Sequence, residues 1–469
     1  MFSRYIIILF LSFLIGSPSF ALTLKEAVDS ALENNPEIHA QASSIDGVKS
    51  QIDQVVSNFY PTIAIQGAYG RSYRTPITYT MTQTAVTTGE IEIPPFPPVE
   101  ITPETEIEPV TLESYADEPQ TARNYGITFT QLLYSGSRRI HQFEIAQANL
   151  QIAQEGLERK KQDLAYQVVE AYYGVLLHKK MLDLNLQSED IARAHLEQAQ
   201  NYFSLGRISN ADLLRAKIKL AEERFSRIEA ENKLESAKVA LNDILGREID
   251  QPVQIEGDLL VISESNLPSS EKITAMAFEN RPEWGILDFK KIIRERKVGI
   301  AKADYFPSLA LQASYNKNNL DPDTPPERIT TGILESESWY VTGVFSWKIF
   351  DSFRTRNKVK EAEAGLEELK ARVKQMRSRI LSEIKKARLY FHAAKSKIKV
   401  AKEQVELSED NLRQVLENYR SGIAGNLEQL EAEKMLNEAK ANLFQAVADL
   451  ELAKAKINLA VGKTVFAIY

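Results

Sequence analysis

One passage of this chain occurs twice. The stretch Asn58–Gly70, NFYPTIAIQGAYG, returns 246 residues later as Asp304–Asn316, DYFPSLALQASYN. In both copies aromatic residues and a proline precede aliphatic residues that alternate with small or polar ones. Pro36 and Pro282, in ENNPEI and ENRPEW, are separated by the same 246 residues. Matching passages at one fixed offset indicate a tandem duplication, in which the chain folds as two copies of one structural unit.

Each copy also contains a long region that favours helix. No proline occurs in residues 120–251 or 327–469, and strong helix formers (Ala, Leu, Glu, Lys and Gln) are abundant in both regions. Apolar residues recur there every seven positions, as they do in coiled coils. The series are Leu436, Leu443, Leu450 and Ile457; Ala439, Ala446, Ala453 and Ala460; and Val359, Leu366, Val373 and Ile380.

One glycine-containing turn interrupts each helical region, at Gly206 in YFSLGRISNADLL and at Gly422 in YRSGIAGNLEQL. A Gly followed by Ser or Asn is typical of a helix C-cap, a tight turn and an N-cap. Each region is therefore predicted to be a helical hairpin of unequal arms, the first with arms over residues 137–205 and 210–245. The helices ahead of the repeated passage are expected to fill the rest of the shorter return path.

Four segments alternate with a period of two, which is typical of β-strands. They cover residues 62–69, 125–130, 308–315 and 339–349. Each has an apolar face and a face of mostly small or polar residues. Aromatic residues near both ends of an apolar strand are typical of the girdles of outer-membrane barrels, and we expect Trp339, Phe345 and Trp347 to form such girdles. Half-buried strands of a soluble sandwich are the alternative.

The N-terminus favours the membrane alternative. A positive charge at Arg4, a short apolar run and a small-x-small site ending at Ala21 predict a secretory signal peptide over residues 1–21. The apolar run is too short to cross about 30 Å of hydrocarbon as a helix. Two structural repeats are expected to follow, residues 22–270 and residues 271–469, each ordered as helices, two strands and a helical hairpin.

Composition excludes several classes of function. The 469-residue chain has a formal net charge of -7 and no strongly basic segment, which argues against nucleic acid as a partner. It has no Cys, so thiol catalysis, disulfides and cysteine zinc sites are excluded. The five His residues show no metal-ligand spacing. The sequence also lacks a phosphate-binding glycine loop and a nucleophile elbow. We therefore expect no enzyme, no cofactor and no metal site.

Four strands cannot close a barrel around a pore. Single-chain outer-membrane barrels begin at about eight strands. An open strand edge in lipid leaves unpaired backbone groups that cost several kcal/mol each. The strands of this chain must therefore be completed by strands of other chains.

In this order, and twice over, these features resemble the TolC family of outer-membrane efflux proteins across essentially the whole mature chain. The passages that carry the resemblance are Asn35-Pro36-Glu37 and Arg281-Pro282-Glu283, the strand entries at Pro61 and Pro307, the segments FTQLLYSGSRR and FSWKIFDSFRTR, and the turns at Gly206 and Gly422.

The resemblance implies an α+β membrane protein in the outer membrane of a Gram-negative bacterium. Three subunits with four strands each would form a 12-stranded β-barrel, and long helices would continue it as a periplasmic coiled-coil barrel. Such homotrimers act as exit ducts for inner-membrane transporters of the RND, ABC or MFS type, joined through periplasmic adaptor proteins.

The resemblance also implies a gate at the helix tips. In the family an Asp after the first turn bonds a Tyr before the second, and acidic residues one helical turn apart ring the constriction. The matching residues here are Asp212, Tyr419, Glu428 and Glu431. Two solvated Glu on a helix are the alternative for the acidic pair. Ala424 stands where a further Arg link would be expected, and Arg207 is a candidate substitute.

The turns themselves are a candidate docking surface for an adaptor. Glycine leaves backbone exposed between two helices, so a partner hairpin can approach closely. The residues concerned are Gly206, Arg207, Gly422 and Gly425.

Two segments fall outside the helix and strand patterns. Residues 86–124 hold seven Pro and nine acidic residues against one Arg, which predicts an extended external loop. That loop could shield the outer mouth, bind cations or have no special role. Residues 247–270 lack a helical pattern and are expected to form a band around the tunnel.

The sequence leaves three alternatives for function. Small-molecule or metal efflux and type I protein secretion are both compatible with an exit duct. A periplasmic coiled-coil scaffold without a pore would account for the heptads and leave the girdled strands unexplained.

Overall fold

The computed structural model describes residues 21–72, 78–81, 110–113, 120–260, 267–322, 335–421 and 423–463. Nearly all of the expected signal peptide, most of the acidic loop, and Gly422 lie outside these residues. The chain forms two compact units. One unit comprises Met1–Ile52, Glu144–Val298 and Lys360–Tyr469; the other comprises Asp53–Phe143 and Gly299–Val359. Each unit takes parts of both expected repeats, and the boundary between the repeats stays a prediction.

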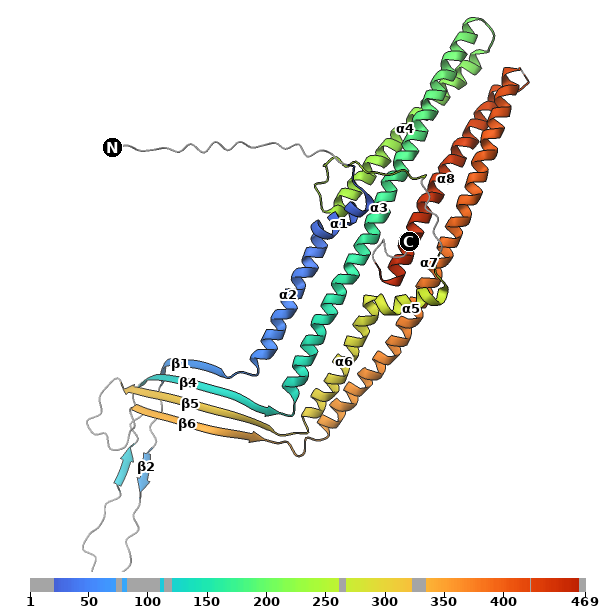
Figure 1. Cartoon of the computed structure of the whole chain (residues 1–469). Helices are drawn as coiled ribbons and strands as arrows, with labels where there is room; N and C mark the ends of the chain where they lie inside the picture. Colours follow the sequence, from blue (N-terminus) through green and yellow to red (C-terminus); the bar gives the residue numbers. More distant parts are fainter. Residues whose placement is uncertain are drawn as a thin grey trace, which may run out of the picture. The chain divides into compact units, whose positions relative to one another are not determined.

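Helices occupy the segments in which the sequence predicted them (Figure 1). The first set is α1 (Leu24–Asn34), α2 (Pro36–Ser57), α3 (Arg138–Ser204) and α4 (Asn210–Leu245). The second set is α5 (Ser270–Asn280), α6 (Pro282–Ala303), α7 (Arg354–Arg420) and α8 (Asn426–Val461). The helices α3 and α7 have 67 residues each, and α4 and α8 have 36 each. Every position of the first hairpin thus has a counterpart 216 residues later. Among the described residues, no helix is long and apolar enough to cross a membrane.

Proline divides the helical stretch ahead of each strand pair. Proline lacks an N–H and has a fixed φ, so it begins a helix readily but interrupts one that is already formed. The residues before Pro36 and Pro282 are extended: Asn35 has φ -68° and ψ 124°, and Arg281 has φ -76° and ψ 120°. Each stretch is therefore two helices joined at a break.

Left-handed glycines end the return arms α4 and α8. Gly246 and Gly462 have φ of 69° and 77°. A Cβ on Gly246 would lie 2.5 Å from the carbonyl oxygen of Asn34, and a Cβ on Gly462 would lie 2.7 Å from that of Asn280. The end of each return arm thus abuts the break between the two shorter helices. This confirms the expectation that those helices complete the return path.

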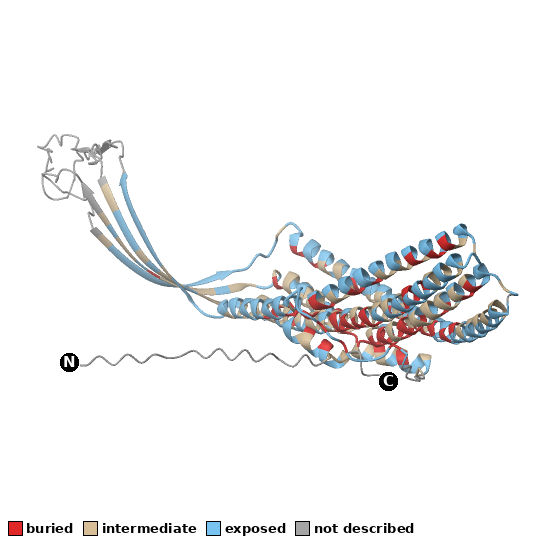
Figure 2. Ribbon diagram, turned by 90° about the horizontal axis from the view of Figure 1, so that it is seen from above, coloured by how far each residue is buried: buried red, intermediate tan, exposed pale blue. Residues whose placement is uncertain are grey.

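The heptad positions contribute to the core of the helical unit (Figure 2). Alanines of the predicted series let the helix backbones approach closely, and larger residues of the other series fill the space between them. The buried members in this unit are Ala439, Ala446, Ala453, Ala460, Leu450, Ile457 and Ile380. Val359 is also buried but belongs to the second unit.

The second unit contains a four-stranded antiparallel sheet in the order β1-β4-β5-β6. Its strands are β1 (Thr62–Ser72), β4 (Gln120–Ser135), β5 (Ser308–Pro322) and β6 (Glu335–Ser346), all longer than or shifted from the predicted segments. Two short strands, β2 (Thr78–Met81) and β3 (Val110–Glu113), pair with each other, and β3 lies inside residues 86–124, the segment predicted as a loop.

Two predicted boundaries need correction. Residues 120–124 belong to β4 rather than to the acidic loop, because they pair with both β1 and β5. Trp347 lies just beyond the end of β6 rather than within a strand reaching residue 349. Its indole Nε1 donates to the carbonyl oxygen of Tyr305, at 3.0 Å, instead of continuing the strand pattern.

The contact at Gly462 predicts a stability difference between two glycines. Gly462→Ala should lower the unfolding temperature, because a left-handed backbone costs an L-residue roughly 1–2 kcal/mol and the new Cβ would overlap Asn280. The matched control is Gly174→Ala, in the middle of α3, where a Cβ has nothing within 4 Å. Thermal unfolding of the purified variants measures both. Equal unfolding temperatures for the two variants would contradict this account of the α8 terminus.

Candidate functional site

The register of the sheet gathers the predicted apolar faces onto one side. Directly paired residues of neighbouring strands share a face. Pairing places Ile65, Ile127, Tyr315 and Trp339 in one row across all four strands. The next such row contains Ile63, Phe129, Ala313 and Val341. Four strands from two distant parts of the sequence therefore build one continuous apolar face.

The expected girdle residues lie at this face or beside it. Trp339 is 75% exposed and Phe345 is also exposed, both on β6. Trp347 follows the strand and is anchored through its indole N–H. Large aromatic residues exposed on a sheet face mark a surface built to meet something apolar. The assignment of these residues to lipid girdles stays a prediction.

The hairpin turn between α3 and α4 has the open geometry expected of a docking surface. Gly206 has φ 67°, and a Cβ there would have nothing within 4 Å. Arg207 is exposed, and its backbone N–H donates to the carbonyl of Tyr202 at 2.9 Å. Leu205 beside them is 66% exposed. Docking at this turn stays a prediction.

The turn between α7 and α8 is similarly open. Gly425 is the N-cap of α8, without a side-chain capping bond, and a Cβ there would also meet nothing within 4 Å. Ile423 and Leu427 expose large apolar side chains. The sequence reading passed over these apolar tip residues, although they directly flank the turn glycines in RSGIAGNLEQL. Gly422 lies outside the described residues.

Asp212 has a structural role in this chain. Its carboxylate and the Ser209 hydroxyl form a capping box at the start of α4. Hydrogen bonds from Ser209 hold the pKa of Asp212 below its ordinary value of 3.8, and Arg215 lies 3.6 Å away. Tyr419 is half-buried near the end of α7. Among the described residues the structure does not join Asp212 to Tyr419 by a hydrogen bond, and the latch stays a prediction.

Glu428 and Glu431 are exposed near the N-terminus of α8. Positions three apart lie on neighbouring parts of one helix face. A carboxylate in the first turn of a helix is also favoured by the helix dipole. Of the two, only Glu428 lies in the first turn of α8. The placement of the pair in a ring at the constriction stays a prediction.

A polar cluster that the sequence reading did not identify joins α3 to α8. Glu433 Oε1 lies 2.9 Å from His195 Nε2, and Gln429 Nε2 donates to the same carboxylate oxygen at 3.0 Å. Gln429 Nε2 also lies 3.2 Å from His195 Nε2. Nearby, Asn437 Nδ2 donates to Ser188 Oγ at 2.9 Å. A lone His on a long helix gives no sequence signal for a partner 238 residues away.

Glu433 stays ionised despite its burial. Burial raises the pKa of its carboxyl, but the bonds from His195 and Gln429, helped by the charges of His195 and Lys219, outweigh it. The pKa therefore ends below the ordinary value of 4.5. A groove of about 390 Å³ lies beside this cluster. Besides His195 and Glu433, the charged residues that line it are Lys219 and Glu223 on α4 and Lys434, Glu438 and Lys440 on α8.

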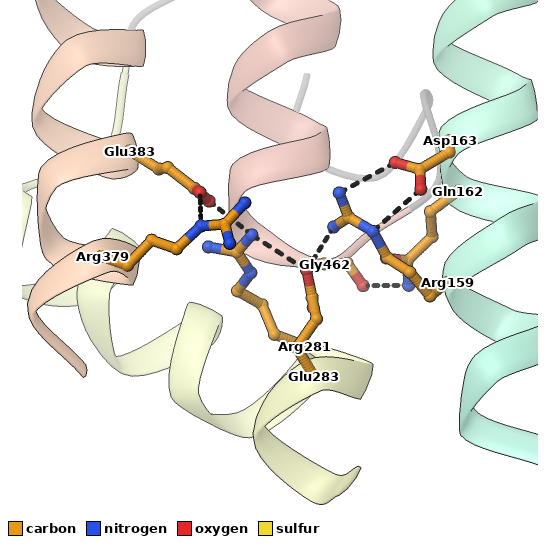
Figure 3. A network of polar contacts seen from close by, with 8 residues as sticks. All are labelled: Arg159, Gln162, Asp163, Arg281, Glu283, Arg379, Glu383 and Gly462. Carbon is orange, nitrogen blue, oxygen red and sulfur yellow. Dashed lines mark hydrogen bonds and ion pairs between the residues drawn. The ribbon is translucent and has the colours of Figure 1, made fainter. Parts of the chain in front are cut away.

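A second polar cluster holds the break between α5 and α6 (Figure 3). The almost fully buried Arg281 donates to Glu383 of α7 at 2.6 Å and to Glu283 of α6 at 3.2 Å. Arg159 of α3 lies 2.7 Å from Glu283. Gln162 of α3 donates to the carbonyl of Gly462 at 2.9 Å. This cluster ties the end of α8 and the α5–α6 break to both long helices.

The first repeat fixes its own break with different side chains. Asn35 Nδ2 donates to the carbonyl of Ile244, at 2.9 Å, and Asn35 Oδ1 accepts the N–H of Glu37, at 2.8 Å. Glu37 is also ion-paired with Lys160 of α3. The NPE and RPE steps therefore mark helix junctions, and their role here is structural.

A comparison with known proteins shows which family this chain belongs to. The family model described as "Outer membrane efflux protein" matches residues 27–247 and 293–463, which together make up most of the chain. The chain belongs to this family. This confirms the resemblance that the duplicated motifs carry, and the match in two parts agrees with a tandem repeat.

Individual relatives of this efflux protein are distant. The cobalt-zinc-cadmium resistance protein CzcC of Cupriavidus metallidurans is 25% identical over 176 residues, which is 38% of this chain and 41% of that protein. Protein CyaE of Bordetella pertussis is 21% identical over 272 residues, 58% of this chain and 56% of that protein. The matched region thus spans about half the length of these curated relatives.

The fold match extends much further. The outer-membrane channel OprN matches with a TM-score of 0.71 at 18% identity, over 94% of this chain and 90% of that chain. The helices, hairpins and four-stranded sheet of this chain therefore share the fold of that structure.

The depressed pKa of Glu433 predicts a pH-dependent effect of Glu433→Gln. A carboxyl with a lowered pKa in the folded state stabilises the fold above its ordinary pKa, and that contribution is lost as pH falls through the lowered value. Glu433→Gln should therefore reduce stability at pH 7, on the order of 1 kcal/mol. The difference from the unsubstituted protein should shrink below about pH 4.5.

Thermal unfolding at pH 7 and at pH 3.5 measures this effect. The control is Glu438→Gln on the same helix, whose carboxylate is largely exposed and 3.8 Å from Lys434. A deficit for Glu433→Gln that is equal at both pH values would show that packing, rather than charge, is responsible.

Proposed function

We propose that this protein is the exit duct of a tripartite export system, carrying substrates passively from an inner-membrane transporter through the outer membrane. The observation that carries the proposal is the sheet: four antiparallel strands with one continuous apolar face, ending in the edge strands β1 and β6. Membership of the outer membrane efflux protein family supports the same role.

The sheet edges require more than one copy of the chain. In hydrocarbon an unpaired backbone N–H or C=O costs several kcal/mol, so only closed barrels are stable there among β-structures. Pairing β6 of one copy with β1 of the next satisfies both edges. Three copies give the 12-stranded barrel of a homotrimer, whose apolar outer face would contact lipid.

The helical hairpins would extend the duct into the periplasm and present their turns to partners. The exposed turns at Gly206, Arg207 and Gly425, together with Gly422, are the proposed contact for a periplasmic adaptor. Exposed apolar residues beside them, Leu205 and Ile423, would supply the buried area of such a contact. The adaptor would in turn connect the duct to a transporter of the inner membrane.

The tips would also carry the gate. Threefold symmetry would bring six carboxylates, from Glu428 and Glu431 of each copy, around one axis. Such a ring attracts cations and repels anions. Asp212 and Tyr419 would form the latch that holds the tips closed, and an adaptor that binds the open form would shift the population towards it.

Substrate choice belongs to the transporter, and the duct itself performs no catalytic step. The name of CzcC describes cobalt, zinc and cadmium resistance, which favours metal export as one substrate class. Type I protein secretion is the second class. A non-channel scaffold would not need the apolar face of the sheet.

The lipid-facing assignment of the sheet predicts opposite outcomes at adjacent residues. Val341→Arg should strongly reduce the trimer recovered from the outer-membrane fraction, since Arg on the lipid face near the midplane costs about 2–4 kcal/mol. Thr342→Arg, one residue later and on the other face, should assemble nearly normally. Heat-modifiable migration on SDS gels measures assembly. Equal recovery of the two variants would contradict the membrane orientation.

The acidic ring predicts the ion selectivity of the duct in planar bilayers. Glu428→Gln with Glu431→Gln should lower cation preference and block by multivalent cations, because the ring loses its charge. Glu438→Gln, further along α8, is the control and should leave both unchanged. In the same recordings Tyr419→Phe should raise the current by removing the latch hydroxyl. Unchanged selectivity in the double variant would place the constriction at other residues.

A further inference from the structure

Leu22, the residue directly after the predicted signal peptide, is bonded through its backbone to a distant segment. It forms a parallel β-bridge with Ile255, in the segment that follows α4. Its N–H donates to the carbonyl oxygen of Gln254, at 2.8 Å, and its own carbonyl oxygen accepts the N–H of Glu256, at 3.0 Å. Both backbone polar groups of the residue after the predicted cleavage site are therefore engaged inside the helical unit.

A buried tyrosine of α3 supports this bridge. The Tyr172 hydroxyl donates to the carbonyl oxygen of Leu22, at 3.0 Å, and also bonds the carbonyl oxygen of Glu256. Tyr172 is 3% exposed. The Leu22 side chain packs against the apolar core to which Tyr172 and Ile255 belong. Backbone bonds, a hydroxyl and apolar contact thus hold Leu22 together.

The bridge also fixes α1 at its first end. At the other end of α1, the Asn35 side chain donates to the carbonyl oxygen of Ile244. Residues 22–35 are therefore held at both ends by residues 244–256, the stretch that begins at the end of α4. The position of Leu22 thus determines the course of part of the segment predicted as a band.

The second repeat lacks the N–H bond made by Leu22. Thr23 and Ser269, which are 246 residues apart, are both helix N-caps whose side chains accept a backbone N–H. The residue before Ser269, and hence the counterpart of Leu22, is Pro268. Proline has no backbone N–H to donate. The bond therefore belongs only to the copy that directly follows the predicted cleavage site.

Two carboxylates make the surroundings of Leu22 negative. Glu26 Oε2 accepts the N–H of Thr23, the next residue, at 2.9 Å. Burial, and after it the charges of Glu256 and Glu26, raises the pKa of Tyr172 to about 12. Both carboxylates therefore act on the hydroxyl that bonds Leu22. A positive charge near the first turn of a helix is disfavoured by the helix dipole, and these two negative charges offset that effect.

We propose that these groups form a binding site for the α-ammonium group that removal of the signal peptide creates on Leu22. Hydrolysis of the Ala21–Leu22 bond by a signal peptidase consumes one water and leaves a carboxylate on Ala21 and an amine on Leu22. An α-amine is protonated at neutral pH. The nitrogen already donates to the Gln254 carbonyl, so protonation makes that bond charge-assisted and stronger. Its two additional N–H groups are donors for the carboxylates of Glu26 and Glu256.

The same geometry sets the order of processing and folding. A peptidase must reach the chain on both sides of the Ala21–Leu22 bond, whereas in the folded unit the N–H and the carbonyl of Leu22 are both engaged. Cleavage therefore precedes the docking of Leu22. This inference goes beyond the proposed duct and does not depend on what the protein exports.

The reactivity of the α-amine tests the site in the full exported protein. The protein is purified in detergent and treated at pH 6.5 with an N-hydroxysuccinimide ester, because α-amines are deprotonated more readily than lysines. Mass spectrometry follows modification of the N-terminal peptide. The comparison variant carries Gly-Ser inserted between Ala21 and Leu22, which moves the new amine by about 7 Å. The Leu22 amine should react about tenfold more slowly than the amine of this variant.

Two adjacent tyrosines provide a matched pair of variants. Tyr172→Phe removes the hydroxyl that bonds the Leu22 carbonyl, so the Leu22 amine should react several-fold faster. Tyr173→Phe, one residue along α3, removes a hydroxyl that lies 3.4 Å from the carboxylate of Glu451 and makes no bond to Leu22. The reaction rate of the amine should be unchanged in that variant.

A pair of carboxylates tests the contribution of charge. Glu256→Gln should also increase the reaction rate of the Leu22 amine, because the site loses a negative charge while its backbone bonds remain. Glu248→Gln removes an exposed carboxylate from the same segment, away from Leu22, and should not change the rate.

The outcomes that would overturn the inference are distinct. A mature protein that begins at a residue other than Leu22 would remove its basis. Equal reaction rates for the unsubstituted protein and the Gly-Ser variant, or for Tyr172→Phe and Tyr173→Phe, would show that the amine is not held at this site. Equal rates for Glu256→Gln and Glu248→Gln would overturn the role of charge in the site.

Discussion

The close backbone contact between a glycine and a helix break underlies the helical part of this protein. At Gly246 and again at Gly462, the end of a return arm lies against the carbonyl of the residue before a break, with no room for a side chain. A long arm of 67 residues can be matched by shorter helices only if these meet end to end. The left-handed glycine ends one helix within a single residue, and the proline starts the next without an unsatisfied N–H. The unequal arms of the two hairpins are thus completed at this junction.

The sequence could predict the features that depend on local physics. Glycine turns, proline breaks, heptads and period-two strands are written in neighbouring residues, and the helix limits and the shared apolar face agree with them. The duplication constrains these features further, because each of them occurs in both copies. The predicted end of β6 was wrong because a contact with a distant segment, rather than the local sequence, decides where the strand ends. Trp347 continues the alternation in sequence, but its indole N–H is satisfied by Tyr305 of another segment.

The polar clusters could not be predicted, since their members are hundreds of residues apart. His195 and Glu433 look like ordinary charged residues on exposed helix faces until α3 and α8 are placed together. Arg281 replaces the Asn of the first repeat, and only the fold shows that Glu383 compensates its buried charge. Asp212 illustrates the converse. Resemblance suggests a latch, whereas the local sequence SNAD already explains its capping bond with Ser209. One carboxylate has two lone-pair-bearing oxygens, so a capping role and a latch role are compatible.

The contact between α3 and α8 joins distant parts of one chain, so its hydrogen bonds form at an effective concentration set by the connection rather than by the amount of protein. A desolvated carboxylate that depends on specific partners, as Glu433 depends on His195 and Gln429, is tolerable there because those partners are always present. Removing one partner would leave the charge buried without compensation, which costs more than the hydrogen bond itself contributes. The cluster is therefore suited to fixing the register of α8 against α3 within a subunit.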